Sequence, residues 1–241
     1  EGIEPQDTGQ VLYLDWETDE EEFTWRKQTL INSLNKRGVS GGGLEESDFP
    51  VSYRRCTDSL VALQPRLRRW LDSNSCPLII IDSLIPALDA DANDSETARR
   101  FMNIIRSFDT TVLVLSHTSK EGKLFGSTFW WNLARNIWSV SKEQNMGESY
   151  TDIAFTHEKS NNSRLYPPFG LRFSNDNDAA LFERIELGDF GAELSKSLPI
   201  RTRIREELKT GKLMTAAEIA EELQVSLESV SMALKRGNGT A

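Results

Sequence analysis

Three apolar runs of the sequence end in side chains able to do chemistry. Within three positions of each run stand carboxylates, hydroxyls or an imidazole: Asp15 and Glu17, Asp82 and Ser83, Ser116 and His117. An apolar strand that ends in an aspartate, such as Asp82, is the arrangement that holds Mg²⁺ on phosphates, usually through water. A second carboxylate, Glu17, is placed to polarise an attacking water. Ser116 or His117 could then contact the terminal phosphate, so these residue types favour nucleotide hydrolysis.

The runs themselves indicate strands of a parallel sheet. Residues 77–83 and 110–117 are continuous, β-branched and apolar, which is typical of strands covered on both faces. Residues 93–108 between them have helical apolar spacing, and Asp82 and His117 are 35 positions apart, the size of one βαβ unit. Because ligands of open parallel sheets bind at the carboxyl ends of the strands, we expect the three polar groups on one rim.

The remaining segments extend this α/β pattern. Thr18 and Glu21 form a capping-box sequence, which predicts a helix that begins there. Residues 51–56 predict a short strand, and residues 57–74 predict a helix that Pro65 bends or breaks. Downstream, four further strands are predicted, and an antiparallel extension of the same sheet is the simplest arrangement: 134–140, 151–157, 169–173 and 180–187. The predicted domains are therefore a core at 1–190, a linker at 191–199 and a small helical unit at 200–241.

Composition narrows the class of protein. The chain has 241 residues, 38% of them hydrophobic, and no apolar stretch near the ~20 residues of a membrane span. Two cysteines and two histidines make neither a disulfide framework nor a zinc site, which predicts a cytoplasmic protein with reduced thiols. The net charge of −9 excludes a surface that attracts nucleic acid as a whole, so any contact with DNA must be local.

Five ordered blocks of the sequence resemble a known family. They are VLYLDWE, IIIDSLIPAL, VLVLSHTSK, FGSTFWWNLARNIWSV and HEKSNNSRLYPPFGLRF, and they span about residues 10 to 190. Together they are similar to the RecA-fold, AAA-type ATPases of the RepA-like group, which includes plasmid replicative helicases. The resemblance implies an α/β RecA-like P-loop NTPase core that uses ATP and Mg²⁺.

The same resemblance implies roles for individual residues. Glu17 corresponds to the catalytic glutamate and Asp82 to the Walker B aspartate that holds Mg²⁺ through water. His117 stands where the family has its phosphate sensor. From their place at the strand ends, and not from the resemblance, Ser83 and Ser116 are predicted to contact the nucleotide. The basic residues of the last two blocks correspond to residues that, in hexameric relatives, reach the nucleotide of the neighbouring subunit: Arg135, Lys159 and Arg164. From the residues alone, Arg135 could simply flank a strand and pair with an acid, and Lys159 and Arg164 would be ordinary solvated charges.

One part of the family pattern is absent. The phosphate-binding loop G-x-x-x-x-G-K-[ST] does not occur in the sequence. The glycine-rich stretch 38–47 does not replace it, because it has no lysine after the glycines, follows a predicted helix and is followed by acids. Two explanations stay open: the loop precedes Glu1 in a longer protein, or the chain is a remnant that binds nucleotide weakly. Under either explanation this chain alone should be a poor ATPase.

The last forty residues predict a separate helical unit. Thr215 and Glu218 form a second capping box, Ser226 is placed to cap a following helix, and an apolar seam joins the two helices. The unit resembles a helix-turn-helix of winged-helix type, in which Ser229, Lys235 and Arg236 would face DNA. Its acidic composition is equally compatible with a protein-contact module.

Two functions from different classes follow. The first is a RecA-fold motor of the RepA-like helicase group, hexameric and acting on single-stranded DNA through channel loops such as residues 118–125, in replication or maintenance of a mobile element. The second is a DNA-binding regulator or assembly factor whose RecA-like part only senses nucleotide.

Overall fold

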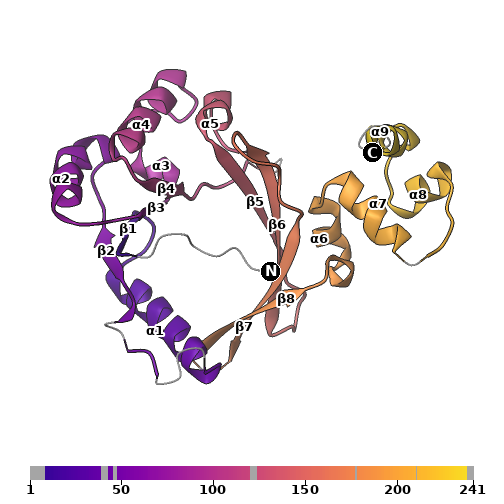
Figure 1. Cartoon of the computed structure of the whole chain (residues 1–241), viewed down its shortest axis with the longest axis horizontal. Helices are drawn as coiled ribbons and strands as arrows, with labels where there is room; N and C mark the ends of the chain where they lie inside the picture. The colour runs from indigo at the N-terminus through magenta and orange to yellow at the C-terminus, as the bar shows by residue number, and fades with distance from the viewer. Residues whose placement is uncertain are drawn as a thin grey trace. The chain divides into compact units, whose positions relative to one another are not determined.

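The computed structural model describes residues 9–38, 43–45, 48–119, 124–176, 178–209 and 211–237, with the backbone alone at 176, 236 and 237. The chain divides into two compact units, one up to Ala134 and one from Arg135 onward. Figure 1 labels the helices and strands of both units. The stretches 38–47 and 118–125 that the sequence singled out lie partly outside the described residues.

A parallel sheet of four strands forms the centre of the first unit. In spatial order the strands are β2 (Val51–Arg55), β1 (Val11–Asp15), β3 (Leu78–Asp82) and β4 (Thr111–Val114). All three pairings are parallel, and Asp15 pairs in register with both Arg55 and Asp82. The β-branched and aromatic residues of these strands fit the pleated, half-buried surface of such a sheet.

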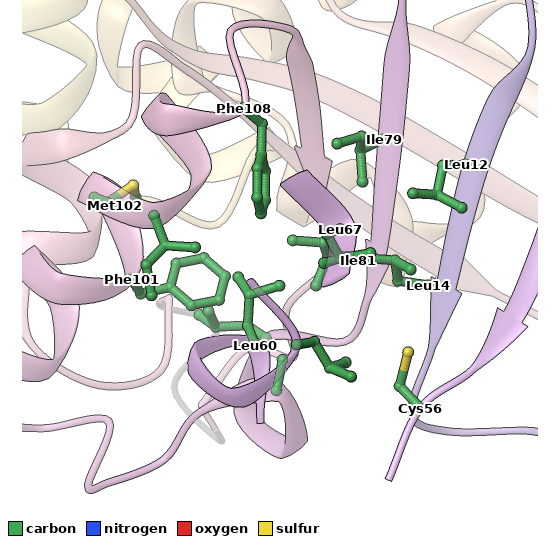
Figure 2. Packing of buried hydrophobic residues seen from close by; sticks show 14 of the residues in the cluster. Leu12, Leu14, Cys56, Leu60, Leu67, Ile79, Ile81, Phe101, Met102 and Phe108 are labelled. Atoms are coloured by element: carbon green, nitrogen blue, oxygen red, sulfur yellow. The ribbon is translucent and has the colours of Figure 1, made fainter. Parts of the chain in front are cut away.

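Helices pack around this sheet, and the hydrophobic core of the unit lies against one face of it. The helices are α1 (Glu20–Lys36), α2 (Leu60–Ser73), α3 (Leu84–Ala87), α4 (Ser95–Ser107) and α5 (Thr128–Leu133). Alternate strand residues such as Leu14 and Ile81 are buried against Leu60 and Leu67 of α2 and Phe101 of α4 (Figure 2). α2 continues through Pro65, at its sixth position, so the expected break does not occur.

The opposite face of the sheet corrects one expectation. β4 was predicted to be buried on both faces, but Leu113 and the adjoining Leu115 are 48% and 40% exposed. β4 is an edge strand of the described sheet, and α1 places Phe23 over Tyr13 and Tyr53, which belong to β1 and β2. A continuous apolar run therefore indicated a parallel strand correctly without indicating how well its second face is covered.

The start of α1 corrects a second expectation, which concerns the residue that caps this helix. The N-cap is Asp19, whose side chain accepts a hydrogen bond from the backbone N–H of Glu22, whereas the sequence predicted Thr18. The hydroxyl of Thr18 is not available for capping because it donates to the carboxylate of Asp15. The capping-box pattern thus predicted the helix correctly and its first residue wrongly.

The second unit begins with an antiparallel sheet. Its strands, in spatial and sequence order, are β5 (Asn136–Glu143), β6 (Tyr150–Ser160), β7 (Phe169–Asp176) and β8 (Ala179–Ile185). The predicted class, a parallel sheet with further antiparallel strands, is confirmed, and all four of these strands were predicted. Their expected attachment to the parallel sheet is corrected: among the described strands, β5 forms backbone hydrogen bonds with β6 alone, so the four strands make a sheet of their own.

Short helices follow this sheet. After the 3₁₀ turn η2 (Leu187–Asp189), the segment predicted as a linker contains α6 (Ala192–Ser197). Leu194 and Leu198 pack with Phe190 and with Ala154 of β6, so this segment contributes to a small core.

Three helices complete the chain: α7 (Ile200–Leu208), α8 (Ala216–Glu222) and α9 (Leu227–Gly237). They enclose a second small core of buried apolar side chains: Ile204, Ile219, Ala220, Val230 and Ala233. The predicted capping box of α8 is present, with the Thr215 and Glu218 side chains bonded to each other's backbone N–H groups. Across the described residues, no helix is long and apolar enough to cross a membrane.

Candidate functional site: an acidic rim on the parallel sheet

The carboxyl ends of β1, β3 and β4 form one rim of the sheet. Backbone hydrogen bonds continue past the strands, from Trp16 N–H to the Asp82 carbonyl (2.6 Å) and from Leu115 N–H to the Ile81 carbonyl (2.9 Å). A third, from Leu84 N–H to the Leu115 carbonyl (2.8 Å), ties the segment after β3 to the segment after β4. The side chains that follow each strand are thereby held at the same edge, as the sequence predicted.

Glu17 is the meeting point of this rim. The hydroxyl of Ser83 donates a hydrogen bond to Glu17 Oε1, and His117 Nε2 lies 3.5 Å from the same oxygen. The Glu17 side chain is 39% exposed and that of His117 is 77% exposed, so both are open to a ligand from solvent. Three residues from three strand ends therefore meet at one carboxylate, Ser83 through a hydrogen bond and His117 at ion-pair distance.

Asp82 stands beside this group and is oriented by a tyrosine. The hydroxyl of Tyr13 donates to Asp82 Oδ2 at 2.6 Å. Burial, together with this hydrogen bond and the negative charge of Asp82, raises the pKa of Tyr13 well above its usual value of 10. Tyr13 therefore stays protonated at physiological pH and acts as a hydrogen-bond donor. It binds Asp82 Oδ2 and does not occupy Oδ1, the other oxygen of that carboxylate.

Asp15 is a site residue that the sequence did not assign, although it ends the same run as Glu17. Its side chain is buried, and Oδ1 accepts the backbone N–H groups of Glu17 (2.8 Å) and Thr18 (3.0 Å). Oδ2 accepts the hydroxyls of Thr18 and of Tyr53, the latter at 3.3 Å. Burial by itself raises the pKa of Asp15, but these hydrogen bonds outweigh it and hold the pKa below its usual value of 3.8.

Tyr53 belongs to the same network from the other side. Burial and the charge of Asp15 raise the pKa of Tyr53 to about 12. The rings of Tyr13, Phe23 and Tyr53 pack together with centroids 4.3 to 6.2 Å apart; Tyr53 stacks on the other two, and Tyr13 and Phe23 are tilted. The only signal of this network in the sequence is the alternation of β1 and β2, which places Tyr13 and Tyr53 in register on one face.

Ser116 is less closely involved than predicted. Its hydroxyl donates to the backbone carbonyl of His117 at 3.3 Å, and the described residues show no hydrogen bond from it to Glu17 or Asp82. Its place on the rim is confirmed by the chain path, while its contact with a nucleotide stays a prediction.

The predicted basic residues belong to the second unit and lie at one end of its sheet. The backbone N–H of Asn161 donates to the carbonyl of Arg135 at 3.0 Å, and Lys159 pairs in register with Ile137. Arg164 is exposed in the loop after β6. The hairpin of β5 and β6 thus brings Arg135, Lys159 and Arg164 to a common end, which we call the basic end.

An unusual histidine anchors the loop of the basic end. His157 is buried, its ring stacks on Trp138 with centroids 4.3 Å apart, and its Nδ1 accepts the backbone N–H of Tyr166 at 3.1 Å. Ser160 Oγ accepts the N–H of Ser163 at 3.1 Å in the same loop. The backbone around Arg164 is therefore held at both ends, while no hydrogen bond or ion pair from the described residues holds its side chain.

The residues predicted to face DNA lie on α9. The hydroxyls of Ser229 and Ser226 are 2.8 Å apart, Lys235 is exposed, and the side chain of Arg236 lies outside the described residues. The neighbouring α8 carries Glu218, Glu221 and Glu222, and the exposed residues of α9 include Leu227, Met232 and Leu234. This surface is more acidic and apolar than a DNA-binding helix usually is.

The acids of the rim suit a magnesium nucleotide better than a resident metal. In the part of the chain that the structure describes, no group of three or more acids, histidines and cysteines could hold a metal ion by itself. Mg²⁺ at nucleotide sites is held by one or two carboxylates with water and the substrate's phosphates. On the rim, Asp82 would supply such a carboxylate.

The parallel α/β sheet of the first unit has the fold of a RecA-like core. The solved structure of the KaiC-like protein PH0186 from the hyperthermophilic archaeon Pyrococcus horikoshii OT3 has a similar fold. The TM-score is 0.51 and the identity 11%, over 73% of this chain and 76% of that one. At this identity the likeness concerns the fold alone.

A comparison with models of protein families assigns the chain to a particular family. The model described as an AAA domain matches residues 2–123, half of the chain, and includes every residue of the acidic rim. The chain therefore belongs to this AAA domain family, one of the P-loop NTPase families. No protein with a curated description matches the sequence.

Proposed function

We propose that this chain is the ATPase core of a RepA-like motor that hydrolyses ATP and acts on DNA. The observation that carries the proposal is the meeting of Ser83 and His117 at Glu17, beside Asp82, on the carboxyl rim of a RecA-like sheet. A structural surface cluster would not need polar groups from two other strand ends, Ser83 and His117, to share one carboxylate oxygen of Glu17. A hydrolase needs such a group where the terminal phosphate and its attacking water lie.

Each residue of the rim has a distinct part in this proposal. Glu17 accepts the proton of the attacking water, and Ser83 fixes the direction of its carboxylate. His117 donates a hydrogen bond toward the terminal phosphate. When that phosphate is lost, the contact between His117 and Glu17 transmits the change to Glu17. Asp82, oriented by Tyr13, would hold Mg²⁺ through water, and the ion would supply neutralisation of the phosphate charge.

The decisive experiment is single-turnover ATP hydrolysis by the full-length protein and its Glu17→Gln variant. We expect Glu17→Gln to slow hydrolysis by about 10²–10⁴-fold, the usual contribution of a general base, with little change in nucleotide affinity. The matched control is Glu21→Gln, which removes the same charge from an exposed position in the first turn of α1. Equal rates for wild type and Glu17→Gln would remove the hydrolase proposal.

The motor part of the proposal includes a ring of subunits and a DNA strand. Arg164 would reach the nucleotide of a neighbouring subunit, because an exposed cation on a fixed loop suits a contact made in trans. Arg135, exposed before β5, and the half-buried Lys159 of β6 would act with it from the same end of the sheet. Native mass spectrometry of the full-length protein with nucleotide should give six subunits. Single-stranded DNA should raise the ATPase rate of wild type but not of Arg164→Ala, and a strictly monomeric profile would contradict the ring.

A second function is favoured by the surface of α8 and α9. The acids of α8 and the exposed Leu227 and Met232 of α9 suit a protein partner, as expected for an assembly factor with a nucleotide-sensing core. Deletion of residues 200–241 separates the two functions. If the protein is a regulator, the deleted variant should lose the contact with its partner and show no strand displacement. If it is a motor, the core of the deleted variant should still hydrolyse ATP in a DNA-stimulated way.

A further inference from the structure

The carboxylate of Asp15 is a buried charge that the proposed hydrolysis does not use directly. It is 1% exposed, and its two oxygens accept four hydrogen bonds, from two backbone N–H groups and two hydroxyls. A buried carboxylate that is satisfied to this degree is costly to replace, because each donor would be left without a partner. The four donors come from Glu17, Thr18 and Tyr53.

These hydrogen bonds fix the turn that carries Glu17. The backbone N–H of Glu17 is bound to Asp15, and that of the preceding Trp16 is bound to the Asp82 carbonyl. The indole N–H of Trp16 also donates to the carbonyl of Asp58 at 2.9 Å. The half-exposed side chain of Glu17 is not packed in place, so its direction depends on this backbone and on Ser83.

We propose that Asp15 is a positioning residue for Glu17: it holds the turn after β1 so that the Glu17 carboxylate meets Ser83 and His117. This inference rests on the proposed function, since it assigns a second acid to the same site. Asp15 itself touches neither the water nor the phosphates in this proposal. Its charge matters because one carboxylate has the lone pairs to accept four donors, whereas the amide of asparagine has an acceptor on one side only.

The experiment compares Asp15→Asn with wild type in the full-length protein by two independent readouts. Amide hydrogen exchange, measured by NMR or mass spectrometry, should be about 10-fold or more faster at Glu17 and Thr18, because each amide loses a charge-assisted hydrogen bond. Single-turnover hydrolysis should be about 10–100-fold slower, while the affinity for Mg-ATP changes less than about 3-fold. A purely structural role would not produce this split between turnover and affinity.

The matched control is Asp19→Asn. Asp19 accepts the backbone N–H of Glu22 as the N-cap of α1, and asparagine caps helices equally well, so neither readout should change. If Asp15→Asn does not fold, Thr18 provides the same test. Thr18→Val removes one donor to Asp15 and should slow hydrolysis, whereas Thr18→Ser keeps the hydroxyl and should restore it.

The outcomes separate this inference from the proposed function. The positioning role alone is overturned if the amides of Glu17 and Thr18 stay protected from hydrogen exchange in Asp15→Asn. It is overturned likewise if that protection is lost while hydrolysis stays within about 2-fold of wild type. Equal hydrolysis by wild type and Glu17→Gln overturns the proposed function, and the positioning role in catalysis falls with it. Slow hydrolysis by both Glu17→Gln and Asp15→Asn, with Asp19→Asn unchanged, supports both.

Discussion

The acidic rim of the first unit and the basic end of the second carry charges in different ways. On the rim, Asp15 is buried and accepts four hydrogen bonds, and Glu17 is fixed from two sides. At the basic end, Arg164 is exposed, and hydrogen bonds hold the backbone of its loop instead of its side chain. The rim is preorganised by the fold, while at the basic end the exposed guanidinium of Arg164 has no partner among the described residues and would be ordered by a ligand or partner.

This difference has an energetic consequence. Changes that reach the core or the hydrogen bonds beneath the rim should alter both stability and chemistry, because the groups are buried and coupled. Changes at the exposed cations should alter chemistry with little effect on stability, because solvated charges contribute little to folding. The following three predictions test the comparison, from the largest expected effect to the smallest.

The largest effect is expected beneath the rim. Leu14 is fully buried in the core that supports β1, so Leu14→Ala should lower the free energy of unfolding of the first unit by about 2–5 kcal/mol. Urea unfolding followed by tryptophan fluorescence measures it. The control is Val140→Ala on β5, where the side chain is 56% exposed and the change should stay within about 0.5 kcal/mol. Similar losses for the two variants would contradict the comparison.

An intermediate effect is expected from the charge of Asp15. Its pKa is lower in the folded protein than the usual 3.8, so its stabilisation is fully present above pH 3.8 and is lost as the pH falls through the lower, folded pKa. At pH 7, Asp15→Asn should cost about 1–3 kcal/mol. The difference between wild type and variant should shrink in urea titrations below pH 3.8. A difference that grows on acidification would reverse the assigned sign.

The smallest effect is expected at the anchor of the basic end. His157→Phe preserves the ring stack on Trp138 but removes the acceptor for the Tyr166 N–H. Because the replaced ring also has a buried Nε2 without a partner in the described chain, the net cost should be about 1 kcal/mol or less. Amide exchange at Tyr166 should nevertheless become faster. Unchanged exchange would show that the loop is held by other contacts.

Much of the arrangement was predictable from local patterns. The strand at 77–83, the helix at 93–108 and the capping box at Thr215 all form as predicted, since periodicity and capping act over a few residues. The gathering of Glu17, Ser83 and His117 on one rim was also predictable, because parallel strands present their carboxyl ends together. The roles of these residues in catalysis stay predictions.

Other features depended on contacts between distant segments. Nothing local distinguished Asp15 from a solvated strand end; its burial depends on Tyr53, 38 positions later. The hydroxyl of Thr18 belongs to the same hydrogen-bond network, so Thr18 does not cap the helix as the pattern predicted. The separate antiparallel sheet was equally hidden, because strand pairing is decided by which edges meet.

By itself, the sequence determined the strands, the helices and which acids stand at the strand ends, because these follow from short-range periodicity and turn chemistry. Only the tertiary structure decided which of those acids is buried and which is presented to a ligand. That choice depends on desolvation and on donors supplied by neighbouring strands, which a single segment does not contain.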